Sequence, residues 1–430
     1  MTSMHEREGE WSAILRALRF HDSDPASLQS IPEHRWPSLL DLTDRAHLTL
    51  ALAVRCGALL PSFARARVER NLAGNAQRYS RLIATSREIS DALGAAGVEF
   101  VFLKGLTHRP YFNDQSEHRP QYDIDLYCPG AGLTVARRAV EKLGFEPLAD
   151  RRDGPVDHLP TMIRRTGWRW RGNYFDPEQP FSIELHFRFW NPAAECIPVD
   201  GLDDFWCRRT TRNIGPSEIP ALSLPDTLSF AALHLFRHLL RGDVRPHHAY
   251  ELAHFLERSV RDDAFWSQWQ STIPISFQLL QAIPFRLAME CFHCRPNPAV
   301  LSLTRRLPAA VATWFDLFAL SPILAMTHPN KDELLLHLAL VSDRHARRAI
   351  VLRRLLPGRV PRMVLDAHVR SENRWVRAKR RAYQLAFIAS RSMHHVRTLL
   401  PFAGSAFKWW LVRRQRAADD RIARAGIVQG

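Results

Sequence analysis

The sequence predicts an α+β protein in which a small mixed β-sheet is flanked by extensive helices at both ends of the chain. Near the middle of the chain, short stretches have the two-residue period of half-buried strands. Before and after them, apolar residues recur at three- and four-residue spacing, as in helices. A chain of 430 residues with 46% hydrophobic and 24% charged content is also typical of a globular protein with a large core.

The N-terminal part is predicted to be helical. Helical spacing runs from about Trp11 to Ala73, and four prolines divide this region into short helices. A longer helix is predicted from about Asn75 to Ala95, where Gly94 and Gly97 end it. A buried strand, Val98 to Leu103, follows directly.

The central part alternates predicted strands and helices. DIDLY at 123–127 is predicted as a strand, 133–143 as a helix and 145–148 as another strand. The polar and aromatic segment 150–180 is expected to be a hairpin or a flexible insert. FSIELHFRF at 181–189 is a strand by alternation, with Ser182, Glu184, His186 and Arg188 on its polar side. That side either lines a site or is a solvated outer face.

Beyond Pro225 the pattern is helical again. His234 and His238 lie four residues apart and therefore share one helical face, and three more histidines follow at 247, 248 and 254. Histidines at such spacing can bind a metal ion. A role on the helix surface or in a hydrogen-bonded core is the interpretation that the sequence favours.

The positive charge belongs to the C-terminal tail. Of the net charge of +15, residues 341–430 carry 21 basic and 5 acidic side chains, which leaves 38 basic and 39 acidic side chains in residues 1–340. In the tail, arginine clusters alternate with apolar residues, as in AFKWWLV at 406–412. Such a tail suits an anionic membrane surface or a nucleic-acid backbone. A solvated helical subdomain is the simpler alternative.

The cysteines and the N-terminus indicate a cytoplasmic setting. The six cysteines form no disulfide framework, and Cys291 and Cys294 lack the second pair that a zinc site would need. Residues 1–11 are charged, so no signal peptide is expected. The sequence contains no long uncharged apolar run, so no transmembrane helix is predicted. Peripheral contact of the tail with the inner face of the membrane stays open.

A carboxylate pair is the main candidate for chemistry. Asp123 and Asp125 lie two apart on a predicted strand, so both side chains leave the same face, although aspartate is depleted in strands. Such a pair can hold Mg²⁺, with Mn²⁺ as an alternative, together with substrate phosphates. Glu184 on the later strand could complete a set of three carboxylates that holds two metal ions.

A phosphate-binding turn is predicted at the end of the first central strand. Gly105 would allow the backbone to approach a phosphate closely, and Lys104 would add a positive charge beside it. Arg119 lies near the acids in the sequence and could contact phosphate or brace the loop. No P-loop, Rossmann, serine-elbow or HExxH motif competes with this site.

These residues resemble a known family. The run Leu103-Lys104-Gly105, then Tyr111, Asp114, Arg119-Pro120 and the DIDL of 123–126 are similar to the uncharacterised bacterial nucleotidyltransferase family, a branch of the polymerase-β-like nucleotidyltransferase superfamily. The IELHF of 183–187 resembles a later strand of that family, with Glu for Asp and Phe for Trp. The resemblance covers roughly Asn75 to Leu256.

The resemblance implies a nucleotidyltransferase fold, with Asp123, Asp125 and Glu184 as catalytic metal ligands. The glycine–serine pair of the superfamily is here Lys104-Gly105, with Thr107 as the nearest hydroxyl, which implies either a different phosphate grip or a substrate other than an ordinary nucleoside triphosphate. The expected domains are an N-terminal helical region (1–74), a nucleotidyltransferase-like core (75–215), a helical domain (216–340) and a basic helical tail (341–430).

Two functions follow as hypotheses. The first is Mg²⁺-dependent transfer of a nucleotidyl group from a nucleoside triphosphate to a hydroxyl of an unknown acceptor. A small molecule, a peptide or a protein suits the near-neutral body better than nucleic acid does. The second is a non-catalytic scaffold with the same fold, which docks on an anionic membrane or a partner through its basic tail.

Overall fold

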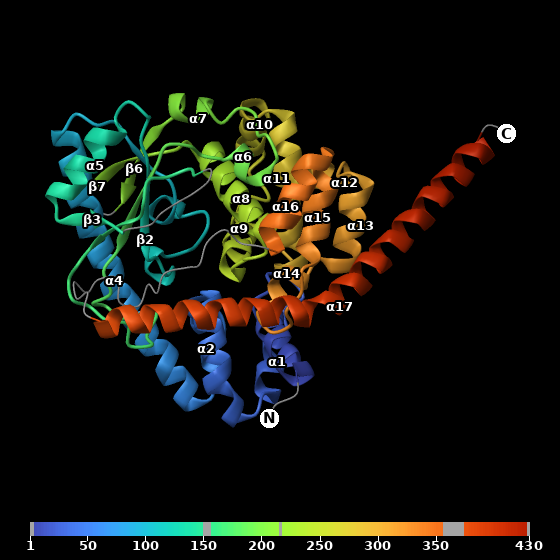
Figure 1. Cartoon of the computed structure of the whole chain (residues 1–430), viewed down its shortest axis with the longest axis horizontal. Helices are drawn as coiled ribbons and strands as arrows, with labels where there is room; N and C mark the ends of the chain where they lie inside the picture. The colour runs from blue at the N-terminus through green and yellow to red at the C-terminus, as the bar shows by residue number, and fades with distance from the viewer. Residues whose placement is uncertain (1–3, 149–155, 215–216, 356–373, 428–430) are drawn as a thin grey trace.

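The computed structural model describes residues 4–148, 156–214, 217–355 and 374–427. It confirms the α+β class, because a mixed seven-stranded sheet lies beside a large helical body (Figure 1). The N-terminal helices lie below both parts, and one long C-terminal helix, α17 (Arg374–Ile427), runs across the molecule and projects beyond it.

The sheet combines antiparallel and parallel pairs. Its strand order is β3-β4-β5-β2-β1-β7-β6. The pairs β2–β5 and β1–β7 are parallel and all others are antiparallel. The strands are β1 (Val101–Phe102), β2 (Asp123–Tyr127), β3 (Phe145–Pro147), β4 (Met162–Arg164), β5 (Ser182–His186), β6 (Thr210–Ile214) and β7 (Ser217–Ala221).

One face of the sheet is buried under two helices. Ile124 and Leu126 of β2 and Ile183 of β5 form a core with α4 (Ser62–Ala95) and α5 (Leu133–Lys142). These side chains alternate with the acids of the same strands, so burial of the apolar face turns the acids to the opposite face. That face is directed toward α8 (Leu224–Arg241) and α9 (Pro246–Arg258).

The N-terminal and C-terminal helices share one hydrophobic core. Trp11, Trp36 and Trp314 are fully buried in it, and the indole N–H of Trp11 donates to the carbonyl of Ile323 at 3.3 Å. The remaining helices are α1 (Met4–Ala17), η1 (Pro25–Ser30), η2 (Glu33–Arg35), α2 (Trp36–Ala46), α3 (Thr49–Cys56), η3 (Gly57–Leu59), η4 (Gly105–His108), η5 (Ser116–His118), α6 (Pro192–Glu195), α7 (Asp204–Cys207), α10 (Asp263–Thr272), α11 (Ile275–Phe292), α12 (Pro298–Arg305), α13 (Ala309–Phe318), α14 (Ser321–Leu324), α15 (Asp332–Leu340) and α16 (Arg344–Leu355).

The structure differs from the sequence-based expectations at three elements. The helix expected from about Asn75 is α4 and begins at Ser62, directly after Pro61, so residue 74 lies within it. The first central strand is reduced to two residues, because β2 ends opposite Val101. The hairpin of β6 and β7 was not expected, since its polar strands show little alternation, and β7 extends the sheet beyond residue 215.

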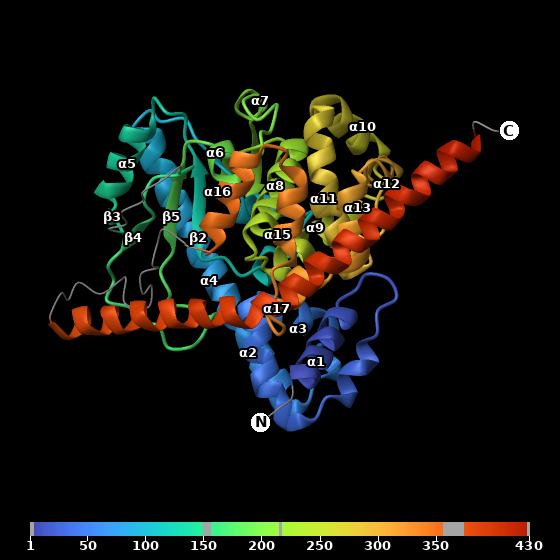
Figure 2. The ribbon, with the colours of Figure 1, turned by 45° about the vertical axis from the view of Figure 1, so that its right-hand side comes forward.

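The long helix α17 packs on the body along only part of its length. Trp409 and Thr398 are buried, and contacts reach α13 and α15. Figure 2 shows the C-terminal part leaving the body. Pro401, which cannot donate an intrahelical hydrogen bond, lies inside the helix, whose axis changes direction partway along. Among the described helices, none combines the length and the hydropathy that a membrane-spanning segment requires.

Candidate active site

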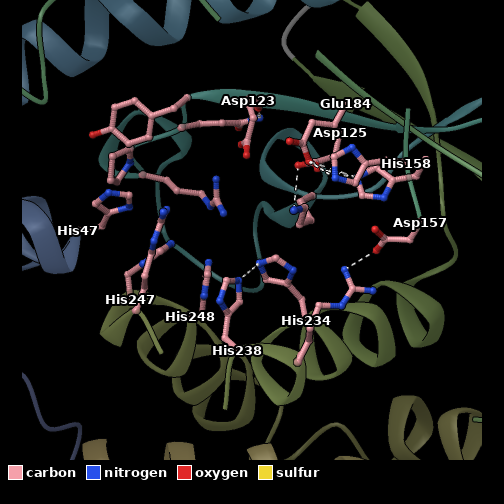
Figure 3. A pocket seen from close by; sticks show the side chains of 18 of the residues that line it. His47, Asp123, Asp125, Asp157, His158, Glu184, His234, His238, His247 and His248 are labelled. Atoms are coloured by element: carbon pink, nitrogen blue, oxygen red, sulfur yellow. Dashed lines mark hydrogen bonds and ion pairs between the residues drawn. The ribbon is translucent and has the colours of Figure 1, made fainter. Parts of the chain in front are cut away.

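Two strands that carry carboxylates lie side by side in the middle of the sheet. The parallel pairing of β2 with β5 sets Asp125 in register with Glu184 and Asp123 in register with Ser182. Side chains in register on neighbouring strands point to the same face. Asp123, Asp125 and Glu184 therefore line one cavity, as Figure 3 shows.

A lysine and a histidine contact these carboxylates. Lys104 Nζ lies 3.0 Å from Asp125 Oδ2, and His186 Nε2 donates to Asp125 Oδ1 at 3.0 Å. The same His186 nitrogen is 3.7 Å from Glu184 Oε2, and the hydroxyl of Thr161 donates to Glu184 Oε1 at 2.9 Å. Possible ligand atoms of Asp125, Glu184 and His186 lie within 4.8 Å of one another.

The three carboxyl groups lie in different electrostatic environments. Burial, together with the charge of Asp125, raises the pKa of Asp123 to about 6. Burial also opposes ionisation of Asp125, but the ammonium of Lys104 and the hydrogen bond from His186 hold its pKa below the ordinary value. For Glu184 the effect of burial is likewise outweighed by His186, so its pKa is lowered. Asp123 is thus the carboxylate with the least compensating positive charge.

The two cations of this cluster are charged at neutral pH. Burial by itself would lower the pKa of His186, but its hydrogen bond to Asp125 and the nearby carboxylate of Glu184 raise it to about 9. Burial likewise opposes the charge of Lys104, and the carboxylates of Asp125, Asp123 and Glu184 together raise its pKa. Three buried or half-buried carboxylates therefore face two cations, which leaves an excess of negative charge.

Of the predicted phosphate turn, Lys104 lines the cavity, whereas Gly105 and Thr107 do not. Gly105 has a φ of 64°, and a Cβ at this position would overlap the side-chain amide of Gln121. That amide donates to the carbonyl of Asp123 at 2.7 Å. Thr107 is buried, and its carbonyl accepts a hydrogen bond from Arg212. Neither Gly105 nor Thr107 is among the residues that line the cavity, so the glycine serves to place Gln121 against β2.

We expect Gly105→Ala to destabilise the protein by about 1–3 kcal/mol, because the positive φ and the overlap with Gln121 both oppose a Cβ. Urea unfolding followed by circular dichroism would show this loss of stability as a lower urea concentration at the unfolding midpoint. Gln121→Ala in the same chain should restore part of it, since it removes the overlap but leaves the backbone cost. Gly94→Ala is the matched control, because a Cβ there meets open space inside α4. Equal effects at both glycines would contradict this explanation.

Arg119 lies in the cavity wall and braces its loop against α9. Its guanidinium forms an ion pair with the buried carboxylate of Glu251, whose Oε2 is also 3.6 Å from His108 Nδ1. Burial raises the pKa of Glu251, but the charge of Arg119 and the nearby ring of His108 outweigh it and lower the pKa to about 2. Of the two roles expected for Arg119, bracing is the one that these contacts support.

Replacing Arg119 with Met should cost about 3–5 kcal/mol of stability, because Glu251 would remain as an unpaired buried charge. The double variant Arg119→Met/Glu251→Met should recover most of the loss. Since the pKa of Glu251 is lowered from 4.5 on folding, its contribution is present above pH 4.5 and is lost as the pH falls toward about 2. Urea midpoints measured at pH 7 and pH 4 would check both results. A double variant no more stable than Arg119→Met would contradict the pairing.

The opposite wall of the cavity carries histidines and arginines from α8 and α9 (Figure 3). The cavity has a volume of about 250 Å³. Arg237 pairs with Asp157 at 2.7 Å, and Arg241 Nε donates to Glu195 Oε1 at 2.9 Å. In the described part of the chain, Arg245 has no acidic partner. The residues of this wall and its rim are His47, Asp157, His234, Arg237, His238, Arg241, Arg245, His247 and His248, whereas His158 lies beside Glu184 on the acidic face.

Sequence reasoning did not assign most of this wall to the site. A usable signal was present, because Arg237 and Arg241 lie four residues apart on α8 and therefore share one side of it. His234 and His238 share that spacing and lie in the cavity wall. For His47 no such signal exists, since only tertiary packing brings the N-terminal helices to this cavity.

A mixed sheet that presents clustered carboxylates to a cavity with a cationic opposite wall suits an enzyme that handles phosphate compounds with a divalent cation. The chain belongs to the family of uncharacterised nucleotidyltransferases, whose sequence model matches residues 7–278. This confirms the family resemblance and extends it over the N-terminal helices. Neither the curated proteins nor the solved structures gave a match. Membership supports nucleotidyl transfer as the general function.

Proposed function

We propose that this protein is a Mg²⁺-dependent nucleotidyltransferase that moves a nucleotidyl group from a nucleoside triphosphate to a hydroxyl group of an acceptor. The observation that carries the proposal is the placement of Asp123, Asp125 and Glu184 in one cavity opposite an arginine- and histidine-rich wall. The family match supports the same reaction class. A non-catalytic scaffold has no evident need for three carboxylates buried together.

The residues of the acidic face fit a hard divalent cation. All three carboxylates offer oxygen ligands, which Mg²⁺ and Mn²⁺ prefer, and the raised pKa of Asp123 shows that the buried acids lack compensating charge. Asp123, Asp125 and Glu184 would hold the ion, which would supply neutralisation of the phosphate oxygens and of the departing pyrophosphate.

The opposite wall would bind the triphosphate. Arg245 is exposed to the cavity and has no acidic partner among the described residues, so its guanidinium is available for phosphate oxygens. Lys104 lies on the acidic face, where its charged Nζ already contacts Asp125 and can orient both the carboxylate and a nearby phosphate. Arg119 closes the site by tying its loop to α9.

The proposed reaction is an in-line displacement at the α-phosphorus. The oxygen of the acceptor hydroxyl forms a new bond to phosphorus while the bond between the α- and β-phosphates breaks, and pyrophosphate leaves. The hydroxyl proton passes to a carboxylate of the site. Residues 1–340 have almost no net charge, which favours a small molecule, a peptide or a protein as the acceptor.

A screen of pyrophosphate release tests this function. The full chain would be incubated with each of the four ribonucleoside triphosphates and Mg²⁺ against a panel of acceptors, including the protein itself. Release that depends on Mg²⁺ and on one acceptor is expected. If calorimetry finds no binding of any triphosphate in the presence of Mg²⁺, the hypothesis of a non-catalytic scaffold replaces that of an enzyme.

We further propose that α17 docks on an anionic membrane surface. Ten apolar side chains of this helix are exposed over an arc of about 140° at 3.6 residues per turn, away from the side that holds Trp409 and Thr398. They are Trp375, Leu385, Ile388, Met393, Val396, Leu399, Leu400, Phe407, Trp410 and Leu411. We call this set the outer face of α17.

Charge decides which partner suits the outer face. Exposed basic residues lie beside this arc at Arg397, Lys408 and Arg413 and within it at Arg374, Arg381 and Arg414, and residues 341–430 carry a net charge of +16. An amphipathic helix of this composition lies in the plane of an anionic lipid interface. Flotation with vesicles of anionic or of purely zwitterionic lipid tests the proposal, and binding to the anionic vesicles alone is expected.

A further inference from the structure

Three histidines on the helical wall of the cavity form a compact triangle. The ring centroids of His234, His238 and His248 are 4.6, 4.6 and 4.9 Å apart. Each ring offers a nitrogen such that the three nitrogens lie within 4.8 Å of one another. Figure 3 shows these rings on the side of the cavity opposite the acids.

The local fold explains this triangle. His234 and His238 lie one helical turn apart on α8, so both face the cavity. Gly242, with a φ of 67°, ends α8, and the short turn after it reverses the chain so that α9 begins at Pro246. The third ligand, His248, is thereby placed beside the other two.

The hydrogen bonds of these rings prepare them as ligands. His238 Nδ1 donates to Asp243 Oδ1 at 3.0 Å, which leaves His238 Nε2 as the nitrogen that faces His234 Nε2 at 3.2 Å. A carboxylate behind a ligand histidine fixes its ring and raises its basicity. His248 Nδ1 is buried and has no hydrogen-bond partner within the described structure.

We propose that His234, His238 and His248 form a second metal site, for Zn²⁺ or a similar borderline-soft divalent ion. Three imidazoles with no carboxylate among them suit such an ion and do not suit Mg²⁺, which prefers oxygen ligands. Three protein ligands leave a fourth position, and because all three rings line the cavity, water or a substrate oxygen would fill it. The cavity would then hold a hard cation on its acidic face and a softer one on its helical wall.

This site does not depend on nucleotidyl transfer, because its ligand set shares no residue with the acidic face. The test therefore measures metal binding in the absence of nucleotide. Full-length protein without a histidine tag would be freed of metal with a chelator and titrated with Co²⁺ in excess Mg²⁺. One equivalent of Co²⁺ with the intense visible absorption of a low-coordinate nitrogen site is expected, and Zn²⁺ should displace it.

The variants follow from the geometry. His238→Ala and His248→Ala should each weaken Zn²⁺ binding by at least about 100-fold, and Asp243→Asn by about 10-fold, because Asp243 acts only through the ring of His238. The matched control is His254→Ala, since this ring also lies on α9 but contacts the carbonyl of Tyr111 instead. It should leave the affinity unchanged.

Two results would overturn the proposal. The first is unchanged Zn²⁺ affinity in either His238→Ala or His248→Ala. The second is loss of the Co²⁺ spectrum in Asp123→Asn/Asp125→Asn, which would assign the ion to the acidic face. Circular dichroism and the thermal midpoint without metal show whether a variant is folded, and His238, which is partly exposed, is the substitution least able to disturb packing.

Discussion

Asp123→Asn/Asp125→Asn is expected to abolish Mg²⁺-dependent nucleotide turnover, with a loss of at least about 10³-fold. The two carboxylates lie on the same face of β2 and line the cavity with Glu184, so their replacement removes two of three proposed metal ligands. Neutralisation of charge by a bound cation is worth several kcal/mol in such reactions, and each 1.4 kcal/mol corresponds to a factor of ten in rate. Pyrophosphate release under single-turnover conditions would measure the effect.

The loss should not come from unfolding. The neutral amides remove like charges that lie close together, but they also remove the pairs that Lys104 and His186 make with Asp125. We therefore expect the urea midpoint of the metal-free double variant to fall by no more than the loss of these two pairs explains. Asp91→Asn is the matched control, because it makes the same chemical change on the exposed side of α4 and should keep full activity. Turnover at the wild-type rate in the double variant would refute the assignment of the active site.

Leu400→Glu is expected to weaken binding to anionic vesicles by about 10- to 100-fold. Leu400 is 80% exposed on the outer face of α17, so its replacement removes no packing within the protein. Burying a leucine in an apolar environment is worth about 1.5–3 kcal/mol, and the new carboxylate would also be repelled by the anionic lipids. Flotation over a series of lipid concentrations would give the change in affinity.

Ser390→Glu provides the control for this change. Ser390 is exposed on the same helix but lies outside the apolar arc, so the substitution adds the same charge without removing an apolar contact. Ser390→Glu should reduce binding to anionic vesicles by no more than the loss of one unit of net positive charge explains. Equal effects of the two variants would mean that charge alone holds the protein to lipid. Concentration-dependent self-association in solution that Leu400→Glu abolishes would assign the outer face to a second copy of the chain.

Much of the central fold was predictable because its strands are strongly patterned. The alternation in 123–127 and 181–189 placed β2 and β5 within a few residues, and it correctly put Asp123 and Asp125 on one side. The start of α4 was misplaced by about one dozen residues, because Gly74, a residue type that often interrupts helices, lies inside α4, where its lack of a Cβ allows the carbonyl of Phe175 to approach. The strands β6 and β7 carry too few apolar residues for their pattern to stand out.

The site was predictable in its acids and less so in its cations. Gly105 was expected to face phosphate, whereas the structure places it against Gln121, because a positive φ suits a tight packing contact as well as a ligand turn. Arg119 was expected either to contact phosphate or to brace its loop, and its pairing with Glu251 joins positions 132 residues apart. No local pattern specifies a pairing over that separation.

The sequence by itself determined the α+β class, the family and the common face of Asp123 and Asp125, because these depend on local periodicity and on a short motif. Only the tertiary structure decided that Glu184 lies beside Asp125, since strand pairing and its register are long-range. The tertiary structure alone also decided that the histidines and arginines of α8 and α9 face the acids across the cavity. For α17, helical spacing revealed an apolar side, but only packing showed that this side faces away from the body. In each case the deciding contact joins residues that the chain order keeps far apart.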